Sequence, residues 1–159
     1  VINTYLTRKM DEGVAPWLKL QVGHDAPDFT AKTSQGNNVS LSQLKGKRIL
    51  IDVWATWCGP CIAEMPLLKK LESEIGDEVN FVSISIDELT EKERWLAFIK
   101  EEGLTGLQLM AEGGWSSDFA TRYIITSIPR FILIDEQGKI ISINAPRASD
   151  PELRKLLIN

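Results

Sequence analysis

Two cysteines, Cys58 and Cys61, are separated by two residues and are the only cysteines among the 159 residues of the chain. They follow the apolar run 49–54 and precede a segment with helical spacing, an arrangement that is typical of thiol–disulfide exchange. A thiolate attacks a disulfide, and the free N–H groups and dipole of a helix N-terminus stabilise negative charge. The spacing therefore predicts a nucleophile at Cys58 and, about one helical turn further on, a resolving thiol at Cys61.

Two other uses of the cysteine pair fit the sequence less well. A structural zinc site needs four ligands, usually Cys and His, whereas the chain has two cysteines and one histidine, His24. His24 lies in a Gly-His-Asp-Ala-Pro context, and we expect it at the surface. A purely structural disulfide across so short a ring would constrain the unfolded chain very little. We predict neither a metal site nor a cofactor.

A strand and a helix are needed to position these cysteines. The apolar run at 48–54 predicts a buried central strand that leads directly to them. Residues 58–75 carry apolar side chains at helical spacing and are followed by Gly76, which predicts a helix that begins at Cys58. Further strands are predicted at 81–86 and 107–110, and further helices at 90–102 and 116–123.

Hairpins complete the predicted organisation on either side. They are expected at 29–33 with 38–41 and at 130–134 with 139–143, with one helical turn at 41–44 and a last helix at 152–158. Asp150 and Pro151 suit the N-cap and first position of that helix. The pattern predicts an α/β fold with a central mixed β-sheet, flanking helices and an N-terminal β-hairpin extension. We divide the chain into a lead-in or linker at 1–22 and one domain at 23–159.

The composition is that of an ordinary globular protein, with 43% hydrophobic and 25% charged residues. Its 18 basic and 22 acidic side chains give a net charge of −4, which argues against nucleic acid or an anionic membrane as a partner. No apolar run reaches the roughly 18 residues of a membrane span. Because the chain opens with Val1 and not with Met, we expect a processed or trimmed form whose export signal or anchor is missing.

These motifs resemble the thioredoxin fold. The matching residues are Ile-Asp-Val-Trp-Ala-Thr-Trp-Cys-Gly-Pro-Cys at 51–61, Pro66, and Ser-Ile-Pro at 127–129. The N-terminal part, with Ala-Pro-Asp-Phe at 26–29 and Leu-x-x-Leu-Lys-Gly-Lys at 41–47, is similar to the TlpA/ResA-like branch. The resemblance covers 23–158 and implies a thioredoxin-like thiol–disulfide oxidoreductase that faces the cell envelope.

The resemblance also implies roles for individual residues. Cys58 would be the exposed nucleophile, and Cys61 the resolving thiol. Pro129 would be a cis-proline that faces the cysteines, and Ile128 would present backbone groups to a bound substrate strand. Trp57 would cover one flank of the site.

The residues between the cysteines indicate the direction of the reaction. Gly59 and Pro60 form the dipeptide found in reducing thioredoxins, and we expect both to contact the substrate. The sequence therefore favours a reductase of protein disulfides or mixed disulfides that receives its electrons from an upstream donor.

Asp52 is the second residue with a chemical signature, because it interrupts an apolar strand. A buried, unpaired carboxylate is costly and holds its proton more tightly than usual. The thioredoxin pattern has an acid at this place behind the resolving cysteine, so Asp52 would accept the proton of Cys61, directly or through a water. The alternative is an acid at a strand edge that pairs with a lysine such as Lys47.

One position departs from the thioredoxin pattern. Thioredoxins usually place a lysine near this acid, on the neighbouring strand, where this chain has Ser83. The ResA-like branch often has an acid just after that strand, and Asp87 or Glu88 could take this place. We select Glu88 as the candidate tuning acid, and the alternative is a solvated Asp-Glu turn.

We therefore predict a monomeric oxidoreductase in the periplasm or cell envelope of a bacterium, which acts on protein thiols and disulfides and takes part in electron transport. A cytoplasmic location is less expected. Two alternatives stay open at this point. One is a thiol peroxidase of the peroxiredoxin type, although no cysteine follows the Ala-Pro-Asp-Phe segment. The other is a metal-binding chaperone module, although no histidine follows Cys61 to provide a third ligand.

Overall fold

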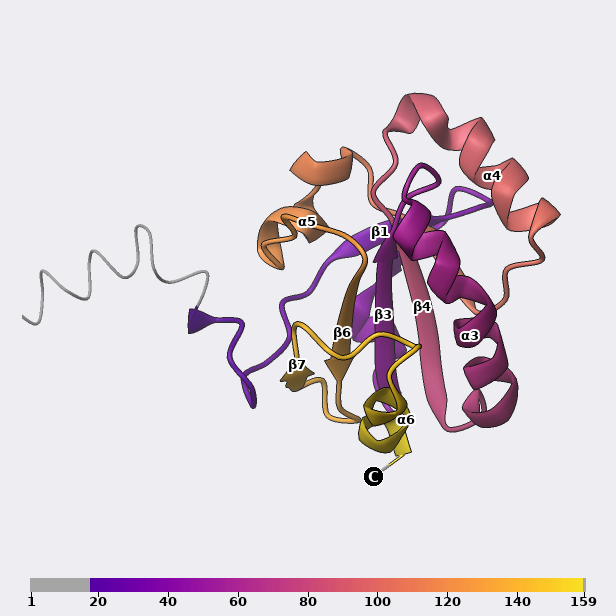
Figure 1. The fold of residues 1–159 in the computed structure, drawn as a ribbon. Helices are drawn as coiled ribbons and strands as arrows, with labels where there is room; N and C mark the ends of the chain where they lie inside the picture. Colours follow the sequence, from indigo (N-terminus) through magenta and orange to yellow (C-terminus); the bar gives the residue numbers. More distant parts are fainter. Residues whose placement is uncertain (1–17, 159) are drawn as a thin grey trace, which may run out of the picture.

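Residues 18–158 are described by a computed structural model, shown in Figure 1. The strands are β1 (Thr30–Thr33), β2 (Asn38–Ser40), β3 (Arg48–Trp54), β4 (Val79–Ser85), β5 (Leu107–Met110), β6 (Arg130–Ile134) and β7 (Ile140–Ser142). They form one sheet in the order β2-β1-β5-β4-β3-β6-β7. Both parallel and antiparallel pairs occur, so the central mixed sheet and the N-terminal hairpin extension are confirmed.

Within residues 18–158, four α-helices and three short 3-10 helices connect or follow these strands. They are η2 (Leu41–Leu44), α3 (Gly59–Ile75), η3 (Leu89–Glu91), α4 (Lys92–Glu101), η4 (Gly114–Ser116), α5 (Asp118–Arg122) and α6 (Pro151–Ile158). Figure 1 shows α3 starting at the upper end of β3 and running back along the sheet. The chain that leaves β3 therefore turns directly into the helix that carries the cysteines.

The central strand β3 is buried along almost its whole length. It pairs in parallel with β4 and antiparallel with β6, which places Asp52 opposite Ser83 on one side and Phe131 on the other. A strand covered on both faces needs a nearly continuous apolar sequence, and every β3 residue except Arg48 is buried.

Two apolar clusters cover the two faces of this strand. Ile51 belongs to the cluster that includes Trp95 of α4 and Phe119 of α5. Leu50 belongs to the other cluster, which includes Leu68 of α3 and residues of α6. Because side chains alternate along a strand, Asp52 points to the same face as Leu50, beneath α3.

The predicted elements agree with the structure except near some ends. β4 begins at Val79, two residues before the strand predicted at 81–86. The helix predicted at 116–123 is instead divided into η4 and α5, because Ser117 interrupts it and caps α5 through the Ala120 N–H at 3.1 Å. Most of the predicted lead-in lies outside the described residues, and the domain boundary at 22–23 stays a prediction.

Candidate active site

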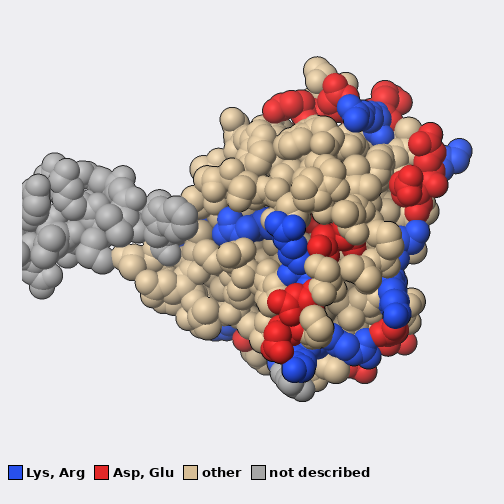
Figure 2. All heavy atoms as spheres, in the orientation of Figure 1, with Lys and Arg blue, Asp and Glu red and all other residues tan. Residues whose placement is uncertain are grey.

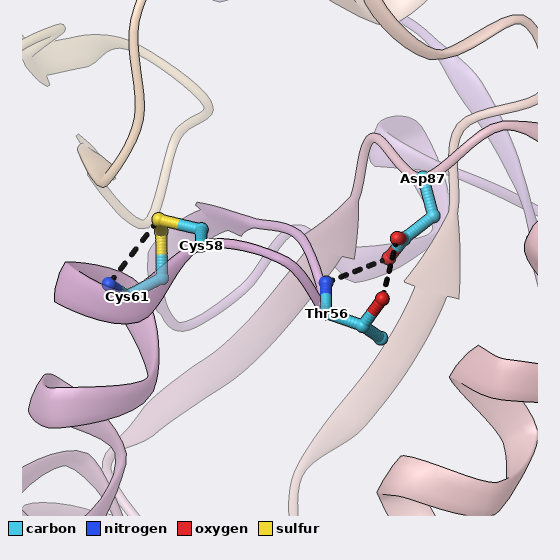
Figure 3. The surroundings of a disulfide bond; sticks show 4 residues. All are labelled: Thr56, Cys58, Cys61 and Asp87. Carbon is cyan, nitrogen blue, oxygen red and sulfur yellow. Dashed lines mark hydrogen bonds between the residues drawn. A yellow bond between two sulfur atoms is a disulfide. The ribbon is translucent and has the colours of Figure 1, made fainter.

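The two cysteines lie at the N-terminus of α3 and form a disulfide, with their Cα atoms 5.3 Å apart (Figure 3). Cys58 is the N-cap of α3, and its Sγ accepts a hydrogen bond from the Cys61 N–H at 3.3 Å. Pro60 stands in the first turn, where its missing N–H removes no helical hydrogen bond. This end of the helix presents donors and the positive end of its dipole to the Cys58 sulfur.

Cys58 is not exposed, contrary to the prediction for the nucleophile. In this oxidised form it is 4% exposed and Cys61 is 3% exposed. The reason is its capping position, since the sulfur turns toward the first helical turn instead of toward solvent. The neighbours Trp57, Gly59 and Pro60 are exposed and form the rim of the site around the buried sulfur.

Asp52 is buried, with 6% of its surface exposed. Its carboxylate accepts one long hydrogen bond, from the Ser83 Oγ at 3.4 Å. Burial raises the pKa of Asp52 from 3.8 to about 7, the negative charge of Glu64 adds to this rise, and the hydrogen bond from Ser83 opposes it. Because β3 is central in the sheet, the alternative of a strand-edge acid paired with Lys47 is wrong.

A pocket beneath α3 reaches the Asp52 carboxyl group. It has a volume of about 30 Å³ and is lined by Asp52 and Ser83 together with Met65 of α3. Gln108 of β5 also lines it, and the Gln108 Oε1 is buried without a hydrogen-bond partner among residues 18–158. Met65 follows Cys61 by four residues, so both side chains lie on the same face of α3. Cys61 on α3 and Asp52 on β3 thus lie on the two sides of one helix–sheet interface.

Glu64 is a second buried acid near the cysteines, and the sequence interpretation did not select it. It is 7% exposed and accepts hydrogen bonds from the Ser149 N–H at 3.0 Å and the Ser149 Oγ at 2.9 Å. The available signal was its position three residues after Cys61, on the inward side of a helix. Through these two hydrogen bonds Glu64 ties α3 to the loop before α6.

Asp87 anchors the segment that leads to the cysteines (Figure 3). It is fully buried, and it accepts hydrogen bonds from the Thr56 N–H at 3.0 Å and the Thr56 Oγ1 at 2.7 Å. The Ser85 Oγ donates a third hydrogen bond at 2.6 Å. Asp87 is therefore no part of a solvated turn, because it fixes the backbone two residues before Cys58.

Glu88, the selected tuning acid, has different surroundings. It is exposed, and its carboxylate lies beside Gly114, where an added Cβ would come within 2.8 Å of the Glu88 Oε1. No contact between Glu88 and either cysteine is found in the described structure. Its influence on the cysteine pair stays a prediction.

The Ile128–Pro129 peptide bond is cis, as the resemblance implied. Both residues are half-buried and stand directly before β6. Arg130, the first residue of β6, pairs with Val53 near the end of β3. The cis-proline thus lies at the end of the sheet where β3 leads into the segment that carries Cys58.

Neither a cluster of metal ligands nor a helix that could span a membrane is found among the described residues. Within residues 18–158, no three Cys, His, Asp or Glu side chains are grouped so that they could hold a metal ion. In the same part of the chain, none of the helices has the length and apolar character needed to cross a membrane. His24 is exposed, as expected.

Known proteins are similar in sequence to this chain over most of its length. The Redoxin family matches residues 21–157. The thioredoxin-like protein YneN of Bacillus subtilis is 34% identical over 98% of this chain and 86% of its own length. The thiol-disulfide oxidoreductase ResA of Bacillus thuringiensis is 29% identical over 77% of this chain and 69% of its own length.

Solved structures agree with the sequence comparison. A thiol-disulfide oxidoreductase from Bacteroides fragilis is 30% identical, with a TM-score of 0.73 over 84% of this chain and 99% of that one. A thiol:disulfide interchange protein from Bacteroides sp. is 29% identical, with a TM-score of 0.76 over 89% of this chain and 93% of that one. The thioredoxin-like fold implied by the sequence is therefore confirmed.

Proposed function

Because the chain belongs to the redoxin family and is a thiol–disulfide oxidoreductase, we propose that it reduces protein disulfides through Cys58 and Cys61. The observation that carries this proposal is the cysteine pair at the N-terminus of α3, on the helix that covers the buried acid Asp52. The remaining roles follow from what surrounds each sulfur.

Cys58 makes the first attack. Its thiolate forms a bond to one sulfur of the substrate disulfide, the substrate S–S bond breaks, and the other substrate sulfur leaves as a thiolate. The Cys61 N–H and the helix dipole stabilise the negative charge on Cys58 before the attack. The cis peptide at Ile128–Pro129 supports a role for these two residues in holding the substrate backbone.

Cys61 then releases the substrate. Its thiol gives its proton to the Asp52 carboxylate, directly or through a water in the adjoining pocket, and the resulting thiolate attacks the Cys58 Sγ. The mixed disulfide breaks, the second substrate sulfur leaves as a thiolate, and the Cys58–Cys61 disulfide forms. Two electrons have then passed to the substrate. A pKa of about 7 suits Asp52 to accept and release this proton near neutral pH.

The oxidised pair must be reduced again before the next cycle. An upstream dithiol donor supplies the two electrons by the same exchange chemistry in reverse. The resemblance to the TlpA/ResA-like branch supports a location on the envelope side of a bacterial membrane. We expect the protein to act there as a monomer on partly folded proteins whose disulfides are still accessible.

The equilibrium reduction potential of the Cys58–Cys61 pair tests the proposed direction. It is measured by titration with dithiothreitol or glutathione, and the fluorescence of Trp54 and Trp57 reports the redox state. A value near that of thioredoxin, about −270 mV, is expected for a reductase. A value near about −120 mV, as in the oxidant DsbA, would mean that the pair introduces disulfides instead.

A further inference from the structure

Two exposed tryptophans lie in contact beside the disulfide. Trp57, directly before Cys58, is 52% exposed, and Trp115 of η4 is 39% exposed. Their ring centroids are 6.3 Å apart, with the planes tilted by 39°. These side chains come from elements 58 residues apart in sequence and together form an aromatic patch that continues from the rim of the site.

The backbone holds Trp115 in this place. Gly113 and Gly114 have φ angles of 99° and 57°, in the left-handed region that favours glycine. A Cβ on Gly114 would lie 2.9 Å from the Ile86 carbonyl oxygen, so the turn sits tightly against the chain that leaves β4. The position of Trp115 is thus set by the turn and does not depend on burial of its own ring.

Neither ring is needed to fill the core, since both keep a large part of their surface in water. Single exposed apolar side chains are common on proteins, but a pair of tryptophans beside a reactive centre is the composition of a binding hot spot. An indole offers a large, rigid apolar surface that gains free energy when a second apolar group covers it. The patch is therefore suited to an apolar side chain of the reacting partner.

The charges near the patch also restrict the charge of the substrate segment that can bind there. Figure 2 shows uncharged surface over η4 and the first turn of α3, whereas charged side chains gather over α4. The carboxylate of Glu88 lies against this turn, beside Gly114. An acidic substrate segment would be repelled there, and an uncharged apolar segment would not.

We propose that the Trp57–Trp115 patch binds an aromatic or large aliphatic side chain adjacent to the reactive cysteine of a substrate polypeptide. The protein thereby selects disulfides within apolar, non-acidic segments, which folded proteins keep buried. This inference rests on the proposed function and assigns to Trp115 a part in substrate choice.

The test uses peptides that each contain one cysteine in mixed disulfide with glutathione. They differ only in the residue before the cysteine, which is leucine, glycine or aspartate. The reduced protein reacts with each in a single turnover, and the released thiol gives the second-order rate constant. We expect wild type to prefer leucine over glycine about 10-fold, with aspartate slowest. Trp115→Ala should lower the preference for leucine to about 2-fold, and Trp115→Phe should retain most of it.

Val22→Ala is the matched control, since Val22 is an exposed apolar residue, 73% exposed, outside the site. It should keep the wild-type preference. Equal rates of wild type with leucine and glycine would overturn the inference, even if Trp115→Ala failed to fold. An unchanged preference in a folded Trp115→Ala protein would also overturn it. A wild-type protein that reacts with none of the peptides would instead overturn the proposed function.

Discussion

At the scale of single residues, three buried acids near the cysteines differ in the donors that surround them. Asp87 accepts three hydrogen bonds, Glu64 accepts two, and Asp52 accepts one long bond from Ser83. A carboxylate with several donors is stabilised in its charged form, whereas burial with few donors favours the proton. Asp52 is therefore the acid best suited to exchange a proton, and Asp87 is suited to hold the chain.

Replacement of each cysteine should block a different step of the reaction. Cys58→Ser removes the attacking thiolate, and turnover with a disulfide substrate should be abolished. Cys61→Ser keeps the attack but removes the release step, and stable mixed disulfides with substrate should accumulate. Mass spectrometry of the protein after reaction distinguishes the two results. Full multiple-turnover activity of Cys61→Ser would contradict the two-thiol mechanism.

Asp52→Asn should slow the release step more than the first attack. An amide cannot accept the Cys61 proton, and loss of a general base typically costs about 10²- to 10⁴-fold in rate. Stopped-flow fluorescence at pH 7 separates formation of the mixed disulfide from its resolution. We expect the resolution rate of wild type to rise as Asp52 ionises near pH 7, and the variant should lose this rise. Equal slowing of both steps would count against Asp52 as the base.

A matched control for this variant is Asp77→Asn. Asp77 is an exposed acid in the turn after α3, so its replacement removes the same charge without touching the helix–sheet interface. Both steps should keep their wild-type rates and pH profiles. A change as large as that of Asp52→Asn would mean that overall charge, and not a specific proton acceptor, governs the release step.

At the scale of elements, the end of β4 and the start of α3 are joined by the Asp87–Thr56 hydrogen bonds. Asp87→Ala leaves the buried Thr56 N–H and hydroxyl without their acceptor, and each unsatisfied group costs about 1–3 kcal/mol. For the two groups together we expect the free energy of unfolding of the oxidised protein in urea to fall by about 2–6 kcal/mol. The exposed neighbour Glu88→Gln should change the free energy of unfolding by less than about 0.5 kcal/mol. The reverse order of effects would contradict the anchoring role.

Local patterns were enough to predict most of these elements. The apolar run of β3 and the helical spacing after Cys58 depend on neighbours in the sequence, and both elements lie where they were predicted. β5 and β6 also match their predicted ranges. The division into η4 and α5 was not predicted, because it depends on left-handed glycines and on a cap at Ser117. Neither feature can be recognised from the spacing of apolar residues.

Contacts between distant segments explain what the sequence could not reveal about the site. The choice between Asp87 and Glu88 depends on which side chain turns inward after β4, and only Asp87 meets Thr56. The burial of Cys58 follows from its capping geometry, and the Trp115 contact joins two turns far apart in sequence. The dipeptide at Ile128–Pro129 could be identified as cis only through the family resemblance.

At the scale of the whole molecule, the raised pKa of Asp52 makes the free energy of unfolding depend on pH. The unfolded chain releases this proton near pH 3.8, whereas the folded protein holds it to about pH 7. Between these values the folded state binds one more proton than the unfolded state, so the free energy of unfolding falls as pH rises. The loss is complete above about pH 7 and amounts to about 4 kcal/mol for this one group.

Asp52→Asn should therefore stabilise the oxidised protein at pH 8 and remove this part of the pH slope. Near pH 4 the variant and wild type should unfold at similar urea concentrations, because Asp52 is neutral in the folded protein at that pH. At pH 8 the variant should be more stable by a few kcal/mol, because it no longer buries a charge. A variant that is less stable than wild type at both pH values would show that the Asp52 carboxylate is well solvated or paired, and the raised pKa would be wrong.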